Sequence, residues 1–132
     1  MAYVKDVVFD CRHAGTLARF WADALDGYSV APYDEAEVAR LRSQGIDDLI
    51  DDPTVCLISP DSPIRVWFQT VADPKTVKNR LHLDLACKDR SDLEIERLVQ
   101  LGATRHPNQS NEMLVVLLDP EGNEFCVLLR EP

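Results

Sequence analysis

Polar side chains that could bind a metal or move a proton lie at alternate positions of strand-like segments. Asp6 stands in the first such segment, residues 4–11, and His82 and Asp84 stand in a later one, residues 81–87. Neutral imidazole is the commonest metal ligand in proteins and also a competent general base. His82 is therefore the strongest single candidate for a metal ligand or catalytic base. The alternative is a hydrogen-bonded histidine that lines a pocket.

Two further segments, residues 64–71 and 124–129, carry polar side chains in the same alternating pattern. Side chains alternate across a strand, so residues two apart share one face of a sheet. Burying carboxylates without partners is costly, so this polar face is predicted to hold a ligand or metal, or to be a solvated sheet face. Its members are Asp6, Asp10, Arg65, Trp67, Gln69, His82, Asp84, Glu124 and Cys126.

Each remaining candidate ligand has a chemical role and a plainer alternative. Gln69 can offer an amide oxygen to a metal but brings no charge. Asp6 can bind a metal, or it can instead pair with Arg65 or Lys5. Cys126 as a thiolate suits zinc or another soft metal, whereas a buried cysteine more often acts as a small hydrophobic residue.

Aromatic and basic residues near these positions could shape a binding site. Trp67 shares parity with Gln69 and could form an aromatic wall of a cavity, with core or dimer packing as the alternative. Lys75, Lys78 and Arg80 form a basic cluster in an acidic protein, just before the strand-like segment 81–87. They could attract an anionic group of a substrate, or they could form a solvated linker.

The chain repeats one pattern, a strand followed by an amphipathic helix, and this repeat positions the polar residues. Cys11 and Cys87 are 76 residues apart (87 − 11), and so are Asp6 and His82 (82 − 6). The offset changes by only one residue across the following helix, and this near-constant value suggests an internal duplication. Trp21 belongs to the apolar stripe of the first helix and is predicted to lie in the core.

Capping signals mark where the helices begin. Ser91 is predicted to cap the helix of the second half, because Glu94 follows at capping-box spacing. A short helix over Asp34–Gln44 interrupts the first half, with Asp34 as its cap, and residues 47–52 are predicted to form a solvated loop.

Each half therefore reads β-α-β-β-β. The predicted fold class is α+β, with two βαβββ modules in tandem. The whole chain, 1–132, is predicted to be a single domain with modules at about 1–73 and 80–132. The further strands are predicted at residues 28–33, 54–59 and 64–71, and at 103–105, 113–118 and 124–129.

Composition excludes several classes of function. The 132 residues include 14 Lys and Arg against 23 Asp and Glu, a net charge of −9. An acidic surface argues against binding nucleic acid or anionic membranes, and no apolar run is long enough to span a membrane. No signal peptide is recognisable, and four cysteines without CxxC spacing read as reduced thiols, so a cytoplasmic location is predicted.

Several segments together resemble the vicinal oxygen chelate (glyoxalase, bleomycin resistance and extradiol dioxygenase) superfamily. They are LARFWADALDGY after the first strand, LHLDLACKD at the start of the second half, and DPEGNEF before the last strand. The chain is most similar to the small glyoxalase-like domains of unassigned function. The resemblance covers nearly the whole chain, and residues 34–52 are its least typical part. It implies that the two modules form a cupped mixed sheet around one cavity.

The resemblance also implies a possible metal site. Metal-binding members take one ligand from the first and one from the last strand of each module, which maps onto Asp6, Gln69, His82 and Cys126. One divalent ion, zinc or similar, is the implied cofactor, with no metal as the alternative. Cys126 stands where the family usually has glutamate, so a classical glyoxalase reaction, which needs four good ligands and two open positions, is not expected.

The resemblance leaves two main functions open. One is a lyase or isomerase that acts on a small oxygen-rich or carbonyl compound. The other is a metal-free protein that binds or sequesters an antibiotic-like small molecule; an interaction module is a third. In each case a homodimer is implied. The expected catalytic residues are His82 and Gln69, and the expected ligand-binding residues are Asp6, Trp67, Asp84, Arg80 and Glu124.

Overall fold

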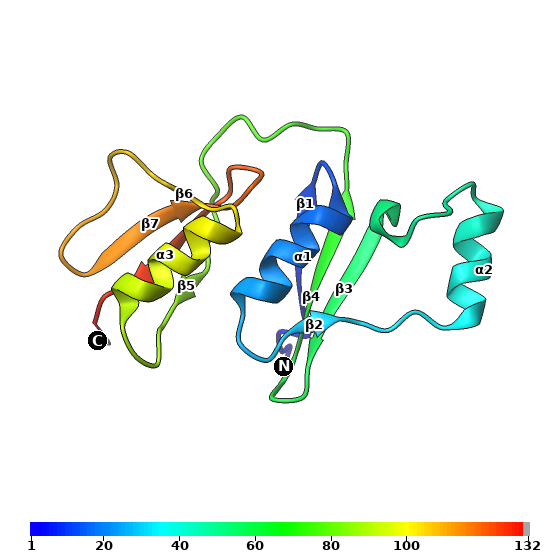
Figure 1. The fold of residues 1–132 in the computed structure, drawn as a ribbon, viewed down its shortest axis with the longest axis horizontal. Helices are drawn as coiled ribbons and strands as arrows, with labels where there is room; N and C mark the ends of the chain where they lie inside the picture. The colour runs from blue at the N-terminus through cyan, green and yellow to red at the C-terminus, as the bar shows by residue number, and fades with distance from the viewer. Residues whose placement is uncertain (131–132) are drawn as a thin grey trace. The chain divides into compact units, whose positions relative to one another are not determined.

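A computed structural model describes residues 1–130, so the last two residues of the predicted second module lie outside the described part. The chain divides into two compact units, Met1–Pro74 and Lys75–Pro132, here called unit 1 and unit 2 (Figure 1). Each unit contains a four-stranded mixed sheet.

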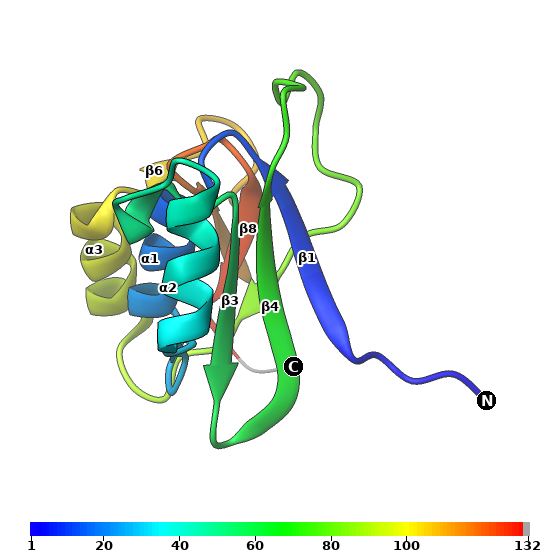
Figure 2. The same cartoon turned by 90° about the vertical axis from the view of Figure 1, so that its right-hand side faces the viewer.

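Unit 1 carries its sheet in the order β1-β4-β3-β2, with β1 parallel to β4 and the other pairs antiparallel. Figure 2 shows β4 lying between β1 and β3. The elements are β1 (Asp6–Cys11), α1 (Ala14–Ala24), β2 (Ser29–Val30), α2 (Glu35–Ser43), a 3-10 helix η1 (Leu49–Asp51), β3 (Thr54–Ser59) and β4 (Ser62–Thr70).

Unit 2 repeats this arrangement, with strand order β5-β8-β7-β6 and β5 parallel to β8. The matching orders confirm the predicted α+β fold of two similar modules in tandem. The elements are β5 (Asp84–Leu85), α3 (Ser91–Leu101), β6 (Thr104–Arg105), β7 (Leu114–Leu118) and β8 (Glu124–Leu128).

The core of unit 1 forms where the apolar stripe of α1 meets the sheet. Trp21 is 1% exposed, as predicted, and its ring lies 5.4 Å from that of Phe9, which stacks on Phe68 at 5.0 Å. The first turn of α1 packs closely on η1, because a Cβ atom added to Gly15 would lie 1.8 Å from the carbonyl oxygen of Ile50. A residue without a side chain is required there.

Two predicted strands are shorter than expected. The segment predicted over residues 81–87 forms ladder pairs only at Asp84–Leu85, extended by a hydrogen bond from the Cys126 amide to the Leu83 carbonyl at 2.9 Å. Leu81, ahead of this pairing, is 74% exposed, and such a residue gains nothing from sheet packing. The segment predicted over residues 28–33 is likewise reduced to β2.

The predicted cap of α3 is wrong. Arg90, not Ser91, is the N-cap residue, and no side chain caps the helix. Glu94 does not reach back to complete a capping box, because both of its oxygens accept hydrogen bonds from Arg97. By contrast, Asp34 caps α2 as predicted, accepting a hydrogen bond from the Glu37 amide at 2.8 Å.

The acidic segment 47–52 is only in part the solvated loop that the sequence suggested, because Asp47, Asp48 and Asp51 are exposed but Asp52 is not. It contains η1, and its last residue, Asp52, is 5% exposed. The buried carboxylate accepts hydrogen bonds from the Tyr33 hydroxyl at 2.8 Å and from the Thr54 amide at 3.0 Å. These partners make the burial of a charged group tolerable.

Candidate functional site

Three residues with metal-ligating side chains meet in unit 2. Asp84 of β5 is paired with Cys126 of β8 in the parallel ladder, and His82 stands two residues before Asp84. The imidazole Nδ1 of His82 lies 3.0 Å from Oδ1 of Asp84. One ligand atom from each of the three side chains lies within 4.8 Å of the other two. The short ladder thus brings an imidazole, a carboxylate and a thiol together.

The cluster combines accessible and buried groups. The side chains of His82 and Asp84 are 41% and 46% exposed, whereas Cys126 is only 6% exposed. Burial raises the pKa of the Cys126 thiol to about 11, and the negative charge of Asp84 and a hydrogen bond with it add to this effect, while Lys78 opposes it. The sulfur is thus protonated at neutral pH, and a metal bound there would have to displace a proton.

The pairing of His82 with Asp84 also suits acid–base chemistry without a metal. When Nδ1 donates its hydrogen to the carboxylate, the lone pair of Nε2 is left as a proton acceptor. The same carboxylate would stabilise the imidazolium formed when Nε2 takes up a proton. His82 and Asp84 are therefore arranged so that His82 could act as a base with Asp84 as its orienting partner, and both side chains are accessible.

Glu124 is buried and holds the segment that leads to His82. Its Oε1 accepts a hydrogen bond from Lys75 Nζ at 3.2 Å and its Oε2 accepts one from the Asn79 amide at 2.9 Å. Burial alone would raise the pKa of Glu124, but these donors outweigh it and leave the pKa below its usual value. The sequence placed Glu124 and Cys126 on a solvated or ligand-lined face, whereas both side chains are buried.

Two of the three residues in the predicted basic cluster donate hydrogen bonds within unit 2. Lys75 donates to Glu124 and also to the Val77 carbonyl at 2.6 Å, and Lys78 donates to the Asn79 carbonyl at 3.3 Å. Arg80 is exposed. Arg80, two residues before His82, thus offers an exposed positive charge. The charge of Lys75 is instead paired with the buried Glu124.

In unit 1 the predicted ligand Asp6 is engaged by Arg65. The guanidinium donates from Nε to Oδ1 at 2.8 Å and from Nη2 to Oδ2 at 3.2 Å, a bidentate pair. Arg65 also lies over the ring of Trp67 at 5.4 Å. The hydrogen bonds from Arg65 hold the pKa of Asp6 below its usual value. The predicted ion pair with Arg65 is therefore present, and a metal bound by Asp6 would have to displace the guanidinium.

The register of β4 places Gln69 away from the position that corresponds to Cys126. Val8 is paired with Trp67 in unit 1, and Asp84, which is 76 residues after Val8, is paired with Cys126 in unit 2. Trp67 therefore corresponds to Cys126. Gln69 is exposed and paired with Asp10, one step further along the same face.

The sequence analysis placed Asp84 only among the ligand-binding residues and did not consider it as a side chain that could bind a metal together with His82 and Cys126. The signal was the spacing of His82 and Asp84, because two residues in a strand separated by one share a face. The pairing of Asp84 with Cys126 could not be read from the sequence without the register of β5 against β8.

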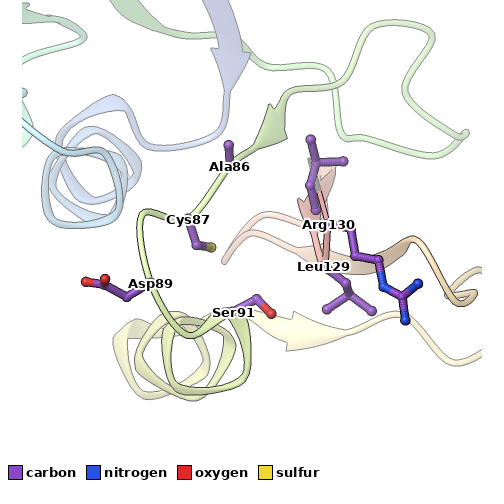
Figure 3. Close-up of a pocket in the computed structure, with 7 residues that line it drawn as sticks. Ala86, Cys87, Asp89, Ser91, Leu129 and Arg130 are labelled. Carbon is purple, nitrogen blue, oxygen red and sulfur yellow. The ribbon is translucent and has the colours of Figure 1, made fainter. Parts of the chain in front are cut away.

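Unit 2 also has a small pocket, which is lined by residues other than the candidates described above. Figure 3 shows the Cys87 and Ser91 side chains turned towards Leu129, while Asp89 points away. Its volume is about 40 Å³, and none of the predicted site residues lines it. Ligand pockets usually have volumes of roughly 300–1,000 Å³, so this one is suited to water rather than to a substrate.

A family model described as glyoxalase-like domain matches residues 6–128. That span includes every strand and helix of both units. No functionally curated protein matches the chain closely enough to establish a relationship. Among the residues that the structure describes, no helix combines the length and apolar character needed to cross a membrane.

Solved structures share the fold at low sequence identity. The fosfomycin resistance protein FosX from Mesorhizobium loti has a TM-score of 0.66 and 14% identity, covering 99% of this chain and 94% of its own. A glyoxalase/bleomycin resistance protein/dioxygenase family enzyme from Burkholderia phytofirmans PsJN has a TM-score of 0.61 and 18% identity, covering 96% and 97%. TnmS3, an antibiotic binding protein from Streptomyces sp. CB03234, has a TM-score of 0.58 and 11% identity, covering 97% and 95%.

Proposed function

This chain belongs to the glyoxalase-like domain family, and from that premise we propose that it is a lyase or isomerase acting on a small carbonyl compound beside His82. The observation that carries the proposal is the contact of 3.0 Å between His82 Nδ1 and Asp84 Oδ1. It combines a solvent-accessible imidazole with a carboxylate that fixes its orientation, the arrangement that general base catalysis needs.

The reaction step that these residues support is removal of a proton from a carbon atom next to a carbonyl group. Nε2 of His82 takes the proton, the C–H electron pair moves to the carbonyl oxygen as an enolate, and Asp84 stabilises the imidazolium. Return of the proton to a neighbouring carbon gives an isomer, and loss of a leaving group instead gives a lyase product. A divalent metal bound at this cluster would instead polarise the carbonyl group, with His82 serving as a ligand rather than as the base.

Exchange of carbon-bound hydrogen tests this step without knowledge of the physiological substrate. Dihydroxyacetone, glycolaldehyde and pyruvate would each be incubated with the protein in D₂O, and the loss of their C–H signals followed by proton NMR. We expect exchange with at least one compound and a rate lower by about 10²-fold or more in His82→Ala.

The matched control is His106→Ala, which removes the same imidazole from a site where Nδ1 only accepts a hydrogen bond from the Asn108 amide at 3.2 Å. This variant should exchange at the wild-type rate. Equal exchange by wild type and His82→Ala would contradict the proposal.

A metal-free binding protein is the second candidate, and the polar face of unit 1 supports it. A guanidinium stacked on a half-buried indole, as Arg65 is on Trp67, offers a flat surface to a planar ligand. One protein of the same fold is described as an antibiotic binding protein. This candidate predicts a ligand that raises the melting temperature and quenches Trp67 emission without any hydrogen exchange.

A further inference from the structure

We propose that unit 2 alone holds a zinc-type ion through His82, Asp84 and Cys126, with Asp84 as the third ligand. The inference goes beyond the proposed function and does not rest on it, because the single lone pair of a neutral imidazole can bind zinc or take up a proton but not both. It departs from the arrangement that the family resemblance implied, in which Asp6 and Gln69 of the first module share the ion.

The three side chains are of the types that zinc prefers. Zinc binds imidazole nitrogen, carboxylate oxygen and thiolate sulfur at roughly 2.0–2.3 Å, and three protein ligands with one open position are typical of catalytic sites. Such bonds place neighbouring ligand atoms roughly 3.3–3.6 Å apart. Here the ligand atoms lie within 4.8 Å of one another. Hard cations such as Mg²⁺ and Ca²⁺ prefer sets made of oxygen alone.

The backbone fixes two of the three ligands relative to each other. Asp84 and Cys126 are partners in the parallel ladder, and the Cys126 amide donates to the Leu83 carbonyl between His82 and Asp84 at 2.9 Å. The sulfur is buried, while the side chains of His82 and Asp84 are 41% and 46% exposed. Rotation of these two accessible side chains can close the remaining distance to an ion.

The corresponding positions of unit 1 do not provide a matching set. Both oxygens of Asp6 accept hydrogen bonds from Arg65, so binding a metal there would break a bidentate ion pair. Val8 and Trp67 occupy the places of Asp84 and Cys126, and neither has an atom that binds zinc well. Unit 2 is therefore the half in which an imidazole, a carboxylate and a thiol converge.

X-ray absorption at the zinc edge of the full-length protein loaded with one equivalent of Zn²⁺ tests the ligand set, because it counts sulfur neighbours. We expect one sulfur in the wild type, none in Cys126→Ser, and two in Asp84→Cys. Cys87→Ser is the matched control, since it removes a half-buried thiol from the same unit and should leave the count at one.

Titration with Zn²⁺ gives the second readout. We expect Asp84→Asn to weaken zinc binding by about 10-fold or more and Asp6→Asn to leave it unchanged. No zinc binding, zinc without a sulfur neighbour, a single sulfur in Asp84→Cys, or equal weakening by Asp6→Asn would each overturn the inference. Circular dichroism of every variant shows that it is folded.

The outcome is separable from that of the proposed function. Zinc bound as described, with no hydrogen exchange on any probe, would contradict the enzyme and leave the metal site standing. Exchange that depends on His82 in a protein that binds no zinc would support the enzyme and overturn the metal site.

Discussion

The two modules place different chemistry at corresponding points of the same framework. In unit 1 the pair Val8 and Trp67 stands where unit 2 has Asp84 and Cys126, and Asp6 stands where unit 2 has His82. The strand orders of the two sheets are the same. The difference teaches that two sheets with the same strand order can carry an ion pair at one set of corresponding positions and a cluster of possible metal ligands at the other.

The largest effect is expected where the two modules differ in how a helix begins. Gly15 and Asp92 are both the second residue of their helices, α1 and α3. Gly15→Ala should destabilise the protein by about 3 kcal/mol, because its Cβ would overlap the Ile50 carbonyl oxygen, which would lie 1.8 Å away. An alanine ordinarily stabilises a helix interior relative to glycine by about 0.5–1 kcal/mol. A loss of stability in Gly15→Ala would therefore indicate the overlap with the Ile50 carbonyl oxygen.

Chemical denaturation measures this change, with Asp92→Ala as the control. Asp92 is exposed, and its ion pair with Arg90 is screened by solvent, so its replacement should lower the free energy of unfolding far less than Gly15→Ala does. A neutral or stabilising Gly15→Ala would mean that α1 does not pack on η1 as described.

A smaller loss is expected at Glu124, which occupies the position that corresponds to Arg65. Glu124→Gln keeps the shape of the side chain but leaves Lys75 without its charged partner, so the free energy of unfolding should fall by about 2 kcal/mol. Arg65→Gln, which breaks an ion pair whose members are 37% and 25% exposed, should cost less. Urea unfolding of both variants at neutral pH gives the order, and the reverse order would contradict the buried role of Glu124.

The order of strands and helices in the two modules could be predicted from the sequence, because it depends on periodic patterns of apolar residues. The alternating strands, the stripe of α1 and the offset of 76 residues together predicted both modules, and β3 was predicted over Thr54–Ser59, as found. Pairing between distant strands was not predictable at the level of single residues. The contact of Asp84 with Cys126 and the burial of Glu124 depend on register, which tertiary packing sets. The pairing of Asp6 with Arg65 was one of the alternatives that the sequence left open, and only the register of β1 against β4 decides for it.

A change in pH should act on the ion pair of unit 1 over a defined range. Arg65 lowers the pKa of Asp6 below the usual 3.8, so the pair's contribution to stability is fully present above pH 3.8 and is lost as the pH falls through the lower, folded-state pKa. An NMR titration of the Asp6 carboxyl carbon measures this midpoint. In Arg65→Gln the midpoint should rise towards 3.8, and an unchanged midpoint would show that Arg65 is not its cause.

The smallest expected effect tests whether unit 1 contributes a ligand at all. Gln69 is exposed and is paired with Asp10 rather than placed opposite Val8. Gln69→Ala should therefore change the free energy of unfolding by no more than about 0.5 kcal/mol. It should also leave the affinity for Zn²⁺ unchanged in calorimetry, since its amide oxygen has no place in the set of His82, Asp84 and Cys126. A clear loss of zinc affinity would instead show that the ion is shared between the two modules, as the family resemblance implied.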